Sequence, residues 1–274
     1  MMTMTSLLPA RLSLRALAVL ALLGALAGCA STGPDVTTAP GELHTPSDDS
    51  PIRQRARTRL TLAASYFQNG QNAVALDETK KALQIDPAFP DAYNLAGLIY
   101  MAMGERQLAQ NHFQRALSLN PNDPDTLHNL GWLQCEEGQY AAAAQAFQRA
   151  MAVPLYQNRA RTLMAQGICE ARSGDKAKAE ETLLNSYKFD PGNPVTGYNL
   201  ALLLYQRGDY TKAQFYIRRI NNSELANASS LWLGIRVEHK LDNHVAMEQL
   251  ASQLRRRFAD SAELKSYDKG AFDE

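Results

Sequence analysis

The side chains best suited to chemistry in this sequence are three cysteines and five histidines. Cys135 and Cys169 lie 34 residues apart, and in an oxidising compartment two such thiols form a disulfide or stay as separate buried thiols. The histidines lack metal-ligand spacing, since even His239 and His244 would point about 140° apart around a helix. No phosphate-binding glycine loop, nucleophile elbow or carboxylate constellation is present. The pattern therefore indicates no enzyme, no metal site and no cofactor.

The remaining cysteine, Cys29, follows a sequence typical of exported proteins. Arg11 and Arg15 precede an apolar run over residues 16–27, which as a helix would span about 18 Å, less than the roughly 30 Å core of a bilayer. Residues 1–28 are therefore predicted to be a signal peptide rather than a permanent transmembrane anchor.

The four residues Leu26-Ala27-Gly28-Cys29 resemble the bacterial lipobox. The resemblance implies that the Cys29 thiol receives a diacylglycerol, that the signal peptide is cut before it, and that the new amino group is acylated. Several acyl chains exceed the threshold for stable anchoring. Residue 30 is alanine and not the aspartate that favours inner-membrane retention in the pattern this resembles, so we expect an outer-membrane, periplasm-facing location.

Residues 29–51 are rich in Ser, Thr, Gly, Pro and Asp and carry almost no large apolar side chain. Such a composition predicts a flexible tether, because it cannot bury enough apolar surface to fold. A coil of this length spans roughly 25 Å, enough to clear the lipid headgroups while keeping the following domain near the membrane.

A period of 34 residues runs through the rest of the chain. Gly70 and Gly104 are 34 apart, as are Gly104 and Gly138, and Pro87 and Pro121. Thirty-four is the period of the tetratricopeptide repeat, in which each copy is a helix-turn-helix unit. Four good copies in succession argue against a set of unrelated amphipathic hairpins.

The residue types within a copy fit that unit. In the second repeat, Gly97 and Ala109 are small where two helices would cross closely, and Phe113 would fill the space around the crossing. Gly104 would support the turn between the helices, and Pro121 would end the second helix.

We therefore predict an all-α protein, a right-handed superhelical solenoid of about six tetratricopeptide repeats over residues 52–260, followed by a polar tail over 261–274. Two extra residues lie in the connection around 154–158, the fifth repeat loses its proline near 221–222, and the degenerate sixth would act as a solvated cap. The repeats are expected at about 56–89, 90–123, 124–159, 160–193, 194–226 and 227–260.

Arrays that these repeats resemble line a concave groove with the second, fifth, ninth and twelfth positions of each first helix. Here those positions are mostly apolar or aromatic, which suits peptide binding, although some could belong to the core. Leu60 and Ala64 stand where carboxylate-clamp repeats need lysine and asparagine, which argues against a chaperone cofactor of that type. The predicted protein-binding residues are Leu60, Phe67, Asn94, Leu98, Met101, His128, Trp132, Met164, Ile168, Tyr198, Leu202 and Tyr205.

The same register places Cys135 and Cys169 at the twelfth and tenth positions of neighbouring first helices. Two residues turn a helix by about 200°, so the two side chains would point in nearly opposite directions and could meet between the helices. Such a bridge would close a loop of about 35 residues. The alternative remains two independent thiols.

The charges balance at 28 basic and 28 acidic residues, which gives no electrostatic attraction for nucleic acid. A groove of apolar and aromatic positions favours a protein ligand. We therefore expect a protein partner, a membrane reached through the lipid anchor, no nucleic acid and no small-molecule substrate.

The order of parts resembles the type IV pilus biogenesis lipoproteins of the PilF and PilW group. The resemblance rests on the lipobox, the tether, six repeats, the triplets Asn-Leu-Ala at 94–96 and Asn-Leu-Gly at 129–131, and Leu-Arg-Arg-Arg-Phe at 254–258. It implies a pilotin-like role, in which the protein escorts the outer-membrane secretin and helps it to multimerise. Two alternatives stay open, namely an envelope adaptor for barrel assembly or cell-wall coordination, and a regulatory partner of an envelope enzyme.

Overall fold

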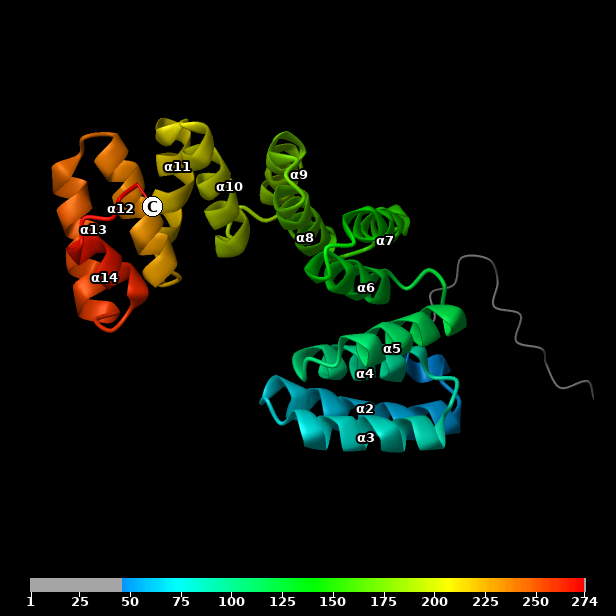
Figure 1. The fold of residues 1–274 in the computed structure, drawn as a ribbon. Coiled ribbons are helices and arrows are strands. Elements are labelled where there is room, and N and C mark those ends of the chain that lie inside the picture. Colours follow the sequence, from blue (N-terminus) through cyan, green and yellow to red (C-terminus); the bar gives the residue numbers. More distant parts are fainter. Residues whose placement is uncertain (1–45, 274) are drawn as a thin grey trace, which may run out of the picture. The chain divides into compact units, whose positions relative to one another are not determined.

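The computed structural model describes residues 46–273, and every regular element in that range is helical. The predicted signal peptide, Cys29 and most of the predicted tether lie outside these described residues. A short 3-10 helix, η2 (Pro46–Asp48), comes first, and from Asp49 onward the chain forms one compact unit of thirteen α-helices (Figure 1). The all-α prediction is confirmed.

Twelve of these helices form six successive hairpins, in which each first helix packs on the second helix that follows it. The first helices are α2 (Pro51–Gln68), α4 (Pro90–Ala102), α6 (Pro124–Glu136), α8 (Arg159–Arg172), α10 (Pro194–Arg207) and α12 (Ala228–Lys240). The second helices are α3 (Asn72–Ile85), α5 (Arg106–Leu119), α7 (Tyr140–Ala152), α9 (Lys176–Phe189), α11 (Tyr210–Asn221) and α13 (His244–Arg257).

Proline sets the start of four first helices, since α2, α4, α6 and α10 all have it within their first two residues. Proline suits this place because the first turn of a helix leaves its N–H groups without helical partners. Side-chain caps complete several of these starts. The Asp123 carboxylate, for example, accepts a hydrogen bond of 2.8 Å from the Thr126 N–H at the start of α6.

Glycine sets the turn inside five hairpins. The glycines at 70, 104, 138, 174 and 208 have φ between 72° and 95°, a left-handed conformation that costs glycine little. The sixth hairpin has Asp242 there instead, at φ 56°, and aspartate is one of the few other residues that tolerate this region. The turn is therefore preserved in the hairpin whose sequence is most degenerate.

The predicted close crossing of the two helices is present in the second, third and fourth hairpins. A Cβ placed on Gly97 would lie 2.5 Å from the Phe113 ring, and one on Gly131 would lie 2.9 Å from the Phe147 ring. Both phenylalanine rings are fully buried. Any side chain at these glycines would push the helices of a hairpin apart.

The connection after α7 carries the two extra residues and is closed by Tyr156. Leu155 adopts φ 60° and is exposed, whereas Tyr156 turns inward and is buried. Its hydroxyl lies 2.9 Å from Thr162 Oγ1 and donates to Asp125 Oδ1 at 3.4 Å. The insertion is thus tied to both flanking first helices, α6 and α8.

The C-terminal residues differ from the predicted polar tail. Residues 262–268 form α14 (Ala262–Asp268), which packs on α12 and α13. Leu264 is buried there, and Tyr267 and Phe272 pack against the same apolar cluster. Leu264 and Tyr267 are three residues apart and share one face of α14, and Phe272 joins them from the turn that follows the helix, so a mostly polar composition still supplies a packing face.

Candidate protein-binding surface

The twelve side chains predicted to bind a partner all lie on first helices, and ten of them are half-buried. The nine apolar members of that set each pack against a cluster of buried residues while keeping part of their surface accessible. We call the accessible parts of the ten the first-helix surface. Its residues are Leu60, Phe67, Asn94, Leu98, Met101, Trp132, Met164, Ile168, Tyr198 and Leu202.

Two of the twelve predicted residues are buried and do not belong to this surface. His128 is 4% exposed, and its Nδ1 lies 3.0 Å from Thr162 Oγ1 on α8, a hydroxyl that also meets the Tyr156 hydroxyl of the irregular connection. Tyr205 is 8% exposed, and its hydroxyl donates to the Phe272 carbonyl at 3.3 Å. Both side chains were predicted to bind a partner, and their burial in the structure leaves neither of them accessible to one.

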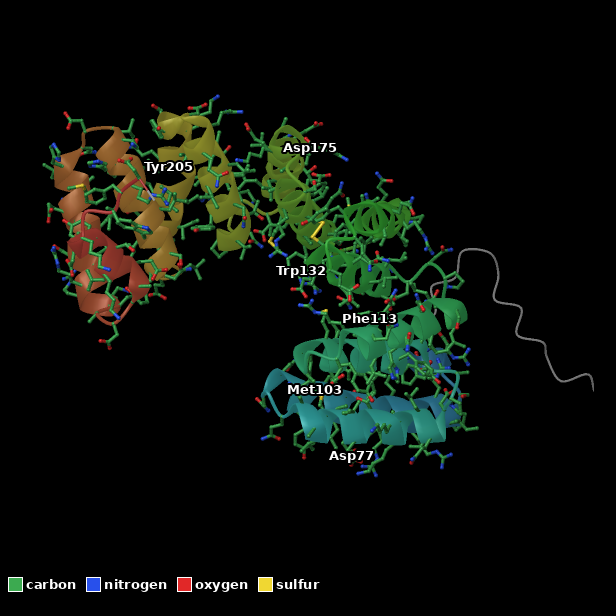
Figure 2. All side chains as sticks on the ribbon, in the orientation of Figure 1. Asp77, Met103, Phe113, Trp132, Asp175 and Tyr205 are labelled. Atoms are coloured by element: carbon green, nitrogen blue, oxygen red, sulfur yellow. A yellow bond between two sulfur atoms is a disulfide. The ribbon has the colours of Figure 1, made fainter. Side chains whose placement is uncertain are left out.

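The structure joins Cys135 on α6 to Cys169 on α8 in a disulfide, with their Cα atoms 5.7 Å apart. Trp132 packs against the cluster that contains both cysteines, and the Arg172 guanidinium lies 5.1 Å from the centre of its ring (Figure 2). The centre of the first-helix surface is therefore held in place by a covalent link between two repeats.

Polar side chains connect successive first helices along the same face. Asn129 Nδ2 on α6 donates to Asn94 Oδ1 on α4 at 2.9 Å, and Asn158 Nδ2 at the start of α8 donates to Asp125 Oδ1 at 3.0 Å. Asn94, one of the predicted partner-binding residues, thus already has its side-chain oxygen engaged as an acceptor. These bonds fix the relative positions of adjacent repeats.

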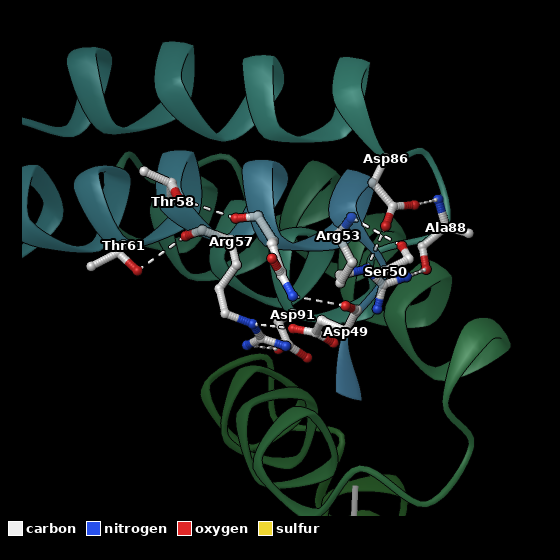
Figure 3. A network of polar contacts seen from close by, with 10 residues as sticks. Asp49, Ser50, Arg53, Arg57, Thr58, Thr61, Asp86, Ala88 and Asp91 are labelled. Atoms are coloured by element: carbon white, nitrogen blue, oxygen red, sulfur yellow. Dashed lines mark hydrogen bonds and ion pairs between the residues drawn. The ribbon is translucent and has the colours of Figure 1, made fainter. Parts of the chain in front are cut away.

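A network of charges closes the start of the array, as Figure 3 shows. Asp49 is buried, and its carboxylate accepts from Arg57 Nε at 2.6 Å. The same guanidinium reaches Asp91 on α4 at 3.4 Å, and hydrogen bonds with both carboxylates help to raise the Arg57 pKa. One arginine therefore joins the entry of the chain to two first helices.

Arg53 extends this network to the connection between the first two hairpins. Its guanidinium pairs with Asp86 and donates to the Ala88 carbonyl at 2.8 Å. It also lies 4.5 Å from the centre of the buried Phe89 ring. This cation and aromatic stack covers the core of the first hairpin at its open end.

His128 makes the stability of the protein depend on pH. Its Nδ1 lies 3.0 Å from Thr162 Oγ1, and burial, with a smaller contribution from Arg161, lowers its pKa from 6.5 to about 4. Between pH 6.5 and about pH 4, the His128 imidazole is therefore protonated in the unfolded chain and neutral in the folded chain. We expect the free energy of unfolding to fall by about 2–3 kcal/mol as pH drops from about 7 to about 4.5.

Urea unfolding at both pH values measures this change, with His128→Gln as the comparison. The pKa of His112 is also lowered by burial, so wild type and variant share that contribution and their difference isolates His128. Equal pH dependence in the two proteins would contradict the assignment.

Nothing in residues 46–273 forms a cluster of three or more His, Cys, Asp or Glu side chains that could hold a metal ion. No helix in the same range combines the length and apolar character needed to span a bilayer. The accessible chemistry of these residues is that of apolar and aromatic side chains set on paired helices, which suits the binding of other proteins.

Comparison with known families identifies the repeat. The family described as Tetratricopeptide repeat matches residues 89–155 and residues 136–194, and the one described as TPR repeat matches residues 64–104. The Type IV pilus assembly protein PilF of Pseudomonas aeruginosa is 26% identical over 262 residues, which cover 93% of this chain and 98% of PilF. This chain is a tetratricopeptide-repeat homologue of PilF.

Solved structures agree with this relationship. The solved structure of Pseudomonas aeruginosa PilF is 27% identical to this chain in sequence, with a TM-score of 0.72 over 80% of this chain and 99% of that one. The crystal structure of PilW, a widely conserved type IV pilus biogenesis factor, is also 27% identical, with a TM-score of 0.72 over 78% of this chain and 98% of that one.

A tetratricopeptide repeat protein from Parabacteroides merdae is 17% identical, with a TM-score of 0.60 over 80% of this chain and 84% of that one. This lower identity shows the shared fold alone. The PilF homologue thus has the repeat architecture of a wide group, whereas its agreement with PilF and PilW extends over nearly the full length of each.

Proposed function

We propose that this PilF homologue is a lipid-anchored scaffold for type IV pilus biogenesis on the periplasmic face of the outer membrane. In this proposal it acts as a pilotin, binding a segment of the pilus secretin and helping the secretin to reach its membrane and multimerise. The observation that carries the proposal is the similarity to PilF, which covers 93% of this chain and 98% of PilF.

The first-helix surface is the part of the molecule that we assign to the secretin. Its apolar side chains are anchored in the core on one side and accessible on the other, so a bound segment would meet side chains that are already ordered. Binding to ordered side chains costs less conformational entropy than binding to mobile ones. Leu98, Met101 and Trp132, from two neighbouring first helices, supply the aromatic and flexible apolar contacts that dominate protein interfaces.

The lipid on Cys29 and the tether that follows would add proximity to this binding surface. A partner inserted in the same membrane meets a tethered domain at an effective concentration of about a millimolar, because the tether confines the domain. A surface of modest affinity is then sufficient to capture the secretin before it assembles. The anchor and the surface therefore act together in this proposal.

Leu98→Glu is expected to reduce secretin binding by at least tenfold. A carboxylate placed at the centre of an apolar contact must lose its water on binding without gaining a partner. Leu108→Glu is the matched control, because Leu108 lies in the same hairpin but on the second helix, where it is 41% exposed. The measurement is the amount of secretin cross-linked to each variant in native membranes, together with the fraction of secretin recovered as multimers.

Circular dichroism and thermal unfolding of both variants show whether a loss of binding comes from a loss of folding. Equal cross-linking in the two variants would remove the first-helix surface from the proposal. Recovery of a barrel-assembly factor, or of a peptidoglycan synthase or hydrolase, in place of the secretin would overturn the pilotin role and favour one of the alternative envelope roles.

A further inference from the structure

The C-terminal residues of the protein lie where the repeat pattern would place a bound peptide. Adding one period of 34 to the lining positions of α10, which are Val195, Tyr198, Leu202 and Tyr205, gives the equivalent positions on α12. These four are Ser229, Trp232, Arg236 and His239. All four contact the chain's own residues from α14 onward.

Phe272 accounts for three of these contacts. Its ring stacks on the His239 ring at 4.4 Å between centres and lies 5.8 Å from the Trp232 ring. Its carbonyl oxygen accepts hydrogen bonds from Arg236 Nε at 3.1 Å and from the Tyr205 hydroxyl at 3.3 Å. The Phe272 ring is therefore bound by two aromatic or imidazole rings, and its backbone carbonyl is bound by two separate hydrogen-bond donors.

Carboxylates on either side of Phe272 complete the arrangement. Asp273 pairs with Lys240 at the end of α12, and Glu263 accepts from Ser229 Oγ at 2.6 Å. The Arg236 guanidinium, which holds the Phe272 carbonyl, lies 4.7 Å from the centre of the Tyr205 ring. The face thus offers two cations and three aromatic or imidazole rings to a segment that carries one aromatic ring and acidic residues.

The way residues 271–273 lie there differs from ordinary helix packing. Gly270 has φ 67° and follows the end of α14, and the Phe272 N–H then donates to the Gly270 carbonyl at 2.9 Å, so the chain turns against α12. Side chains of α10 and α12 bind the backbone carbonyl of residue 272, so the ring alone distinguishes phenylalanine from another residue at this position. Asp273 itself is 76% exposed at its side chain, so its pairing is at the rim.

We propose that this face of α10 and α12 is a second peptide-binding site, specific for a segment of a partner protein with an aromatic residue followed by a carboxylate. Residues 271–273 occupy the site in cis and act as its internal competitor. A partner segment binds when it displaces them. This site is separate from the one assigned to the secretin, because its contacts come from α12 and from Tyr205 near the end of α10 and include none of the ten residues of the first-helix surface.

The competition sets the size of the effect to be measured. Residues 271–273 follow directly on α14, which packs on α12 and α13, so the covalent link holds them near the site at an effective concentration of at least about a millimolar. A free peptide of the same sequence must compete with this, so the wild-type protein should bind it weakly. Loss of the Phe272 ring removes most of the internal competition and exposes the site to the free peptide.

The probe is a fluorescein-labelled peptide with the sequence of residues 268–274, titrated into the full mature protein and followed by fluorescence anisotropy. Phe272→Ala is expected to bind it at least tenfold more tightly than wild type. Adding Arg236→Ala to that variant should abolish most of the gain, because the carbonyl then loses the charged one of its two donors. Phe215→Ala removes an aromatic ring that is 62% exposed on α11 and serves as the matched control, with wild-type binding.

Asp273→Lys provides a second way to open the site without removing a packed ring. It places two cations opposite each other at the rim, so it should also raise the affinity for the probe. Equal weak binding by wild type, Phe272→Ala and Asp273→Lys would overturn the proposal and leave the segment as a structural cap. Self-association of the wild-type protein that Asp273→Lys abolishes would assign the face to a second copy of the chain and would overturn it as well.

Discussion

Removal of the link between Cys135 and Cys169 is expected to lower the free energy of unfolding by about 3–4 kcal/mol. The disulfide closes a loop of about 35 residues, and loop-closure entropy of the unfolded chain gives a stabilisation of this size. The loop contains α7 and the irregular connection to α8, so the link holds together two hairpins whose connection is longer than most others in the array.

Urea unfolding of the oxidised protein, the reduced protein and a Cys135→Ala/Cys169→Ala variant measures the effect. The variant and the reduced protein should agree within about 1 kcal/mol, since both lose the loop constraint. Mass spectrometry of non-reduced peptides from periplasmically exported protein establishes the starting state. Freely alkylated cysteines in that material, or a change below about 1 kcal/mol, would contradict the stabilising role of the bridge.

Replacement of Cys29 with alanine is expected to move the protein from the outer-membrane fraction to the soluble periplasmic fraction. This result rests on the lipobox and on the proposed anchor, because Cys29 lies outside the described residues. Each methylene of an acyl chain in the bilayer contributes about 0.8 kcal/mol, so losing all the chains removes the anchor entirely. Fractionation followed by immunodetection and metabolic labelling with palmitate gives the measurement.

The Cys135→Ala/Cys169→Ala variant is the matched control for this experiment, because it removes two thiols and leaves Cys29. It should stay in the membrane fraction and take up the label. Quantitative recovery of Cys29→Ala with the outer membrane would show that the lipobox interpretation is wrong.

The period of the sequence predicts the hairpins well because it reports on local constraints. The position of Gly97 must be small because the Phe113 ring packs across the hairpin, and the position of Gly104 must adopt a left-handed φ. Both requirements recur with the period of 34 residues. Asp242 shows that the constraint belongs to the turn and not to glycine itself. Features of this kind can be found by counting along the chain.

The burial of individual surface residues was harder to predict, since it depends on segments outside the period. His128 contacts Thr162, whose hydroxyl also meets Tyr156 of the insertion, and the Tyr205 hydroxyl donates to the carbonyl of Phe272, 67 residues later. The one available signal was that Tyr156 and Phe272 are large aromatic residues in otherwise loop-like or polar stretches. Such residues usually need a partner, but the sequence does not say which one.

The charge network at the start of α2 decides how a mechanical pull on the N-terminus would enter the domain. Arg57 lies about two turns inside α2. Its guanidinium pairs with Asp49, which directly precedes the helix cap, and also with Asp91 on the next first helix. A force applied through the proposed membrane anchor would therefore load several polar contacts together, on two first helices, and not the first turn of α2 alone. Under the proposed function, this network would help the domain to stay folded while it is anchored and bound to a partner.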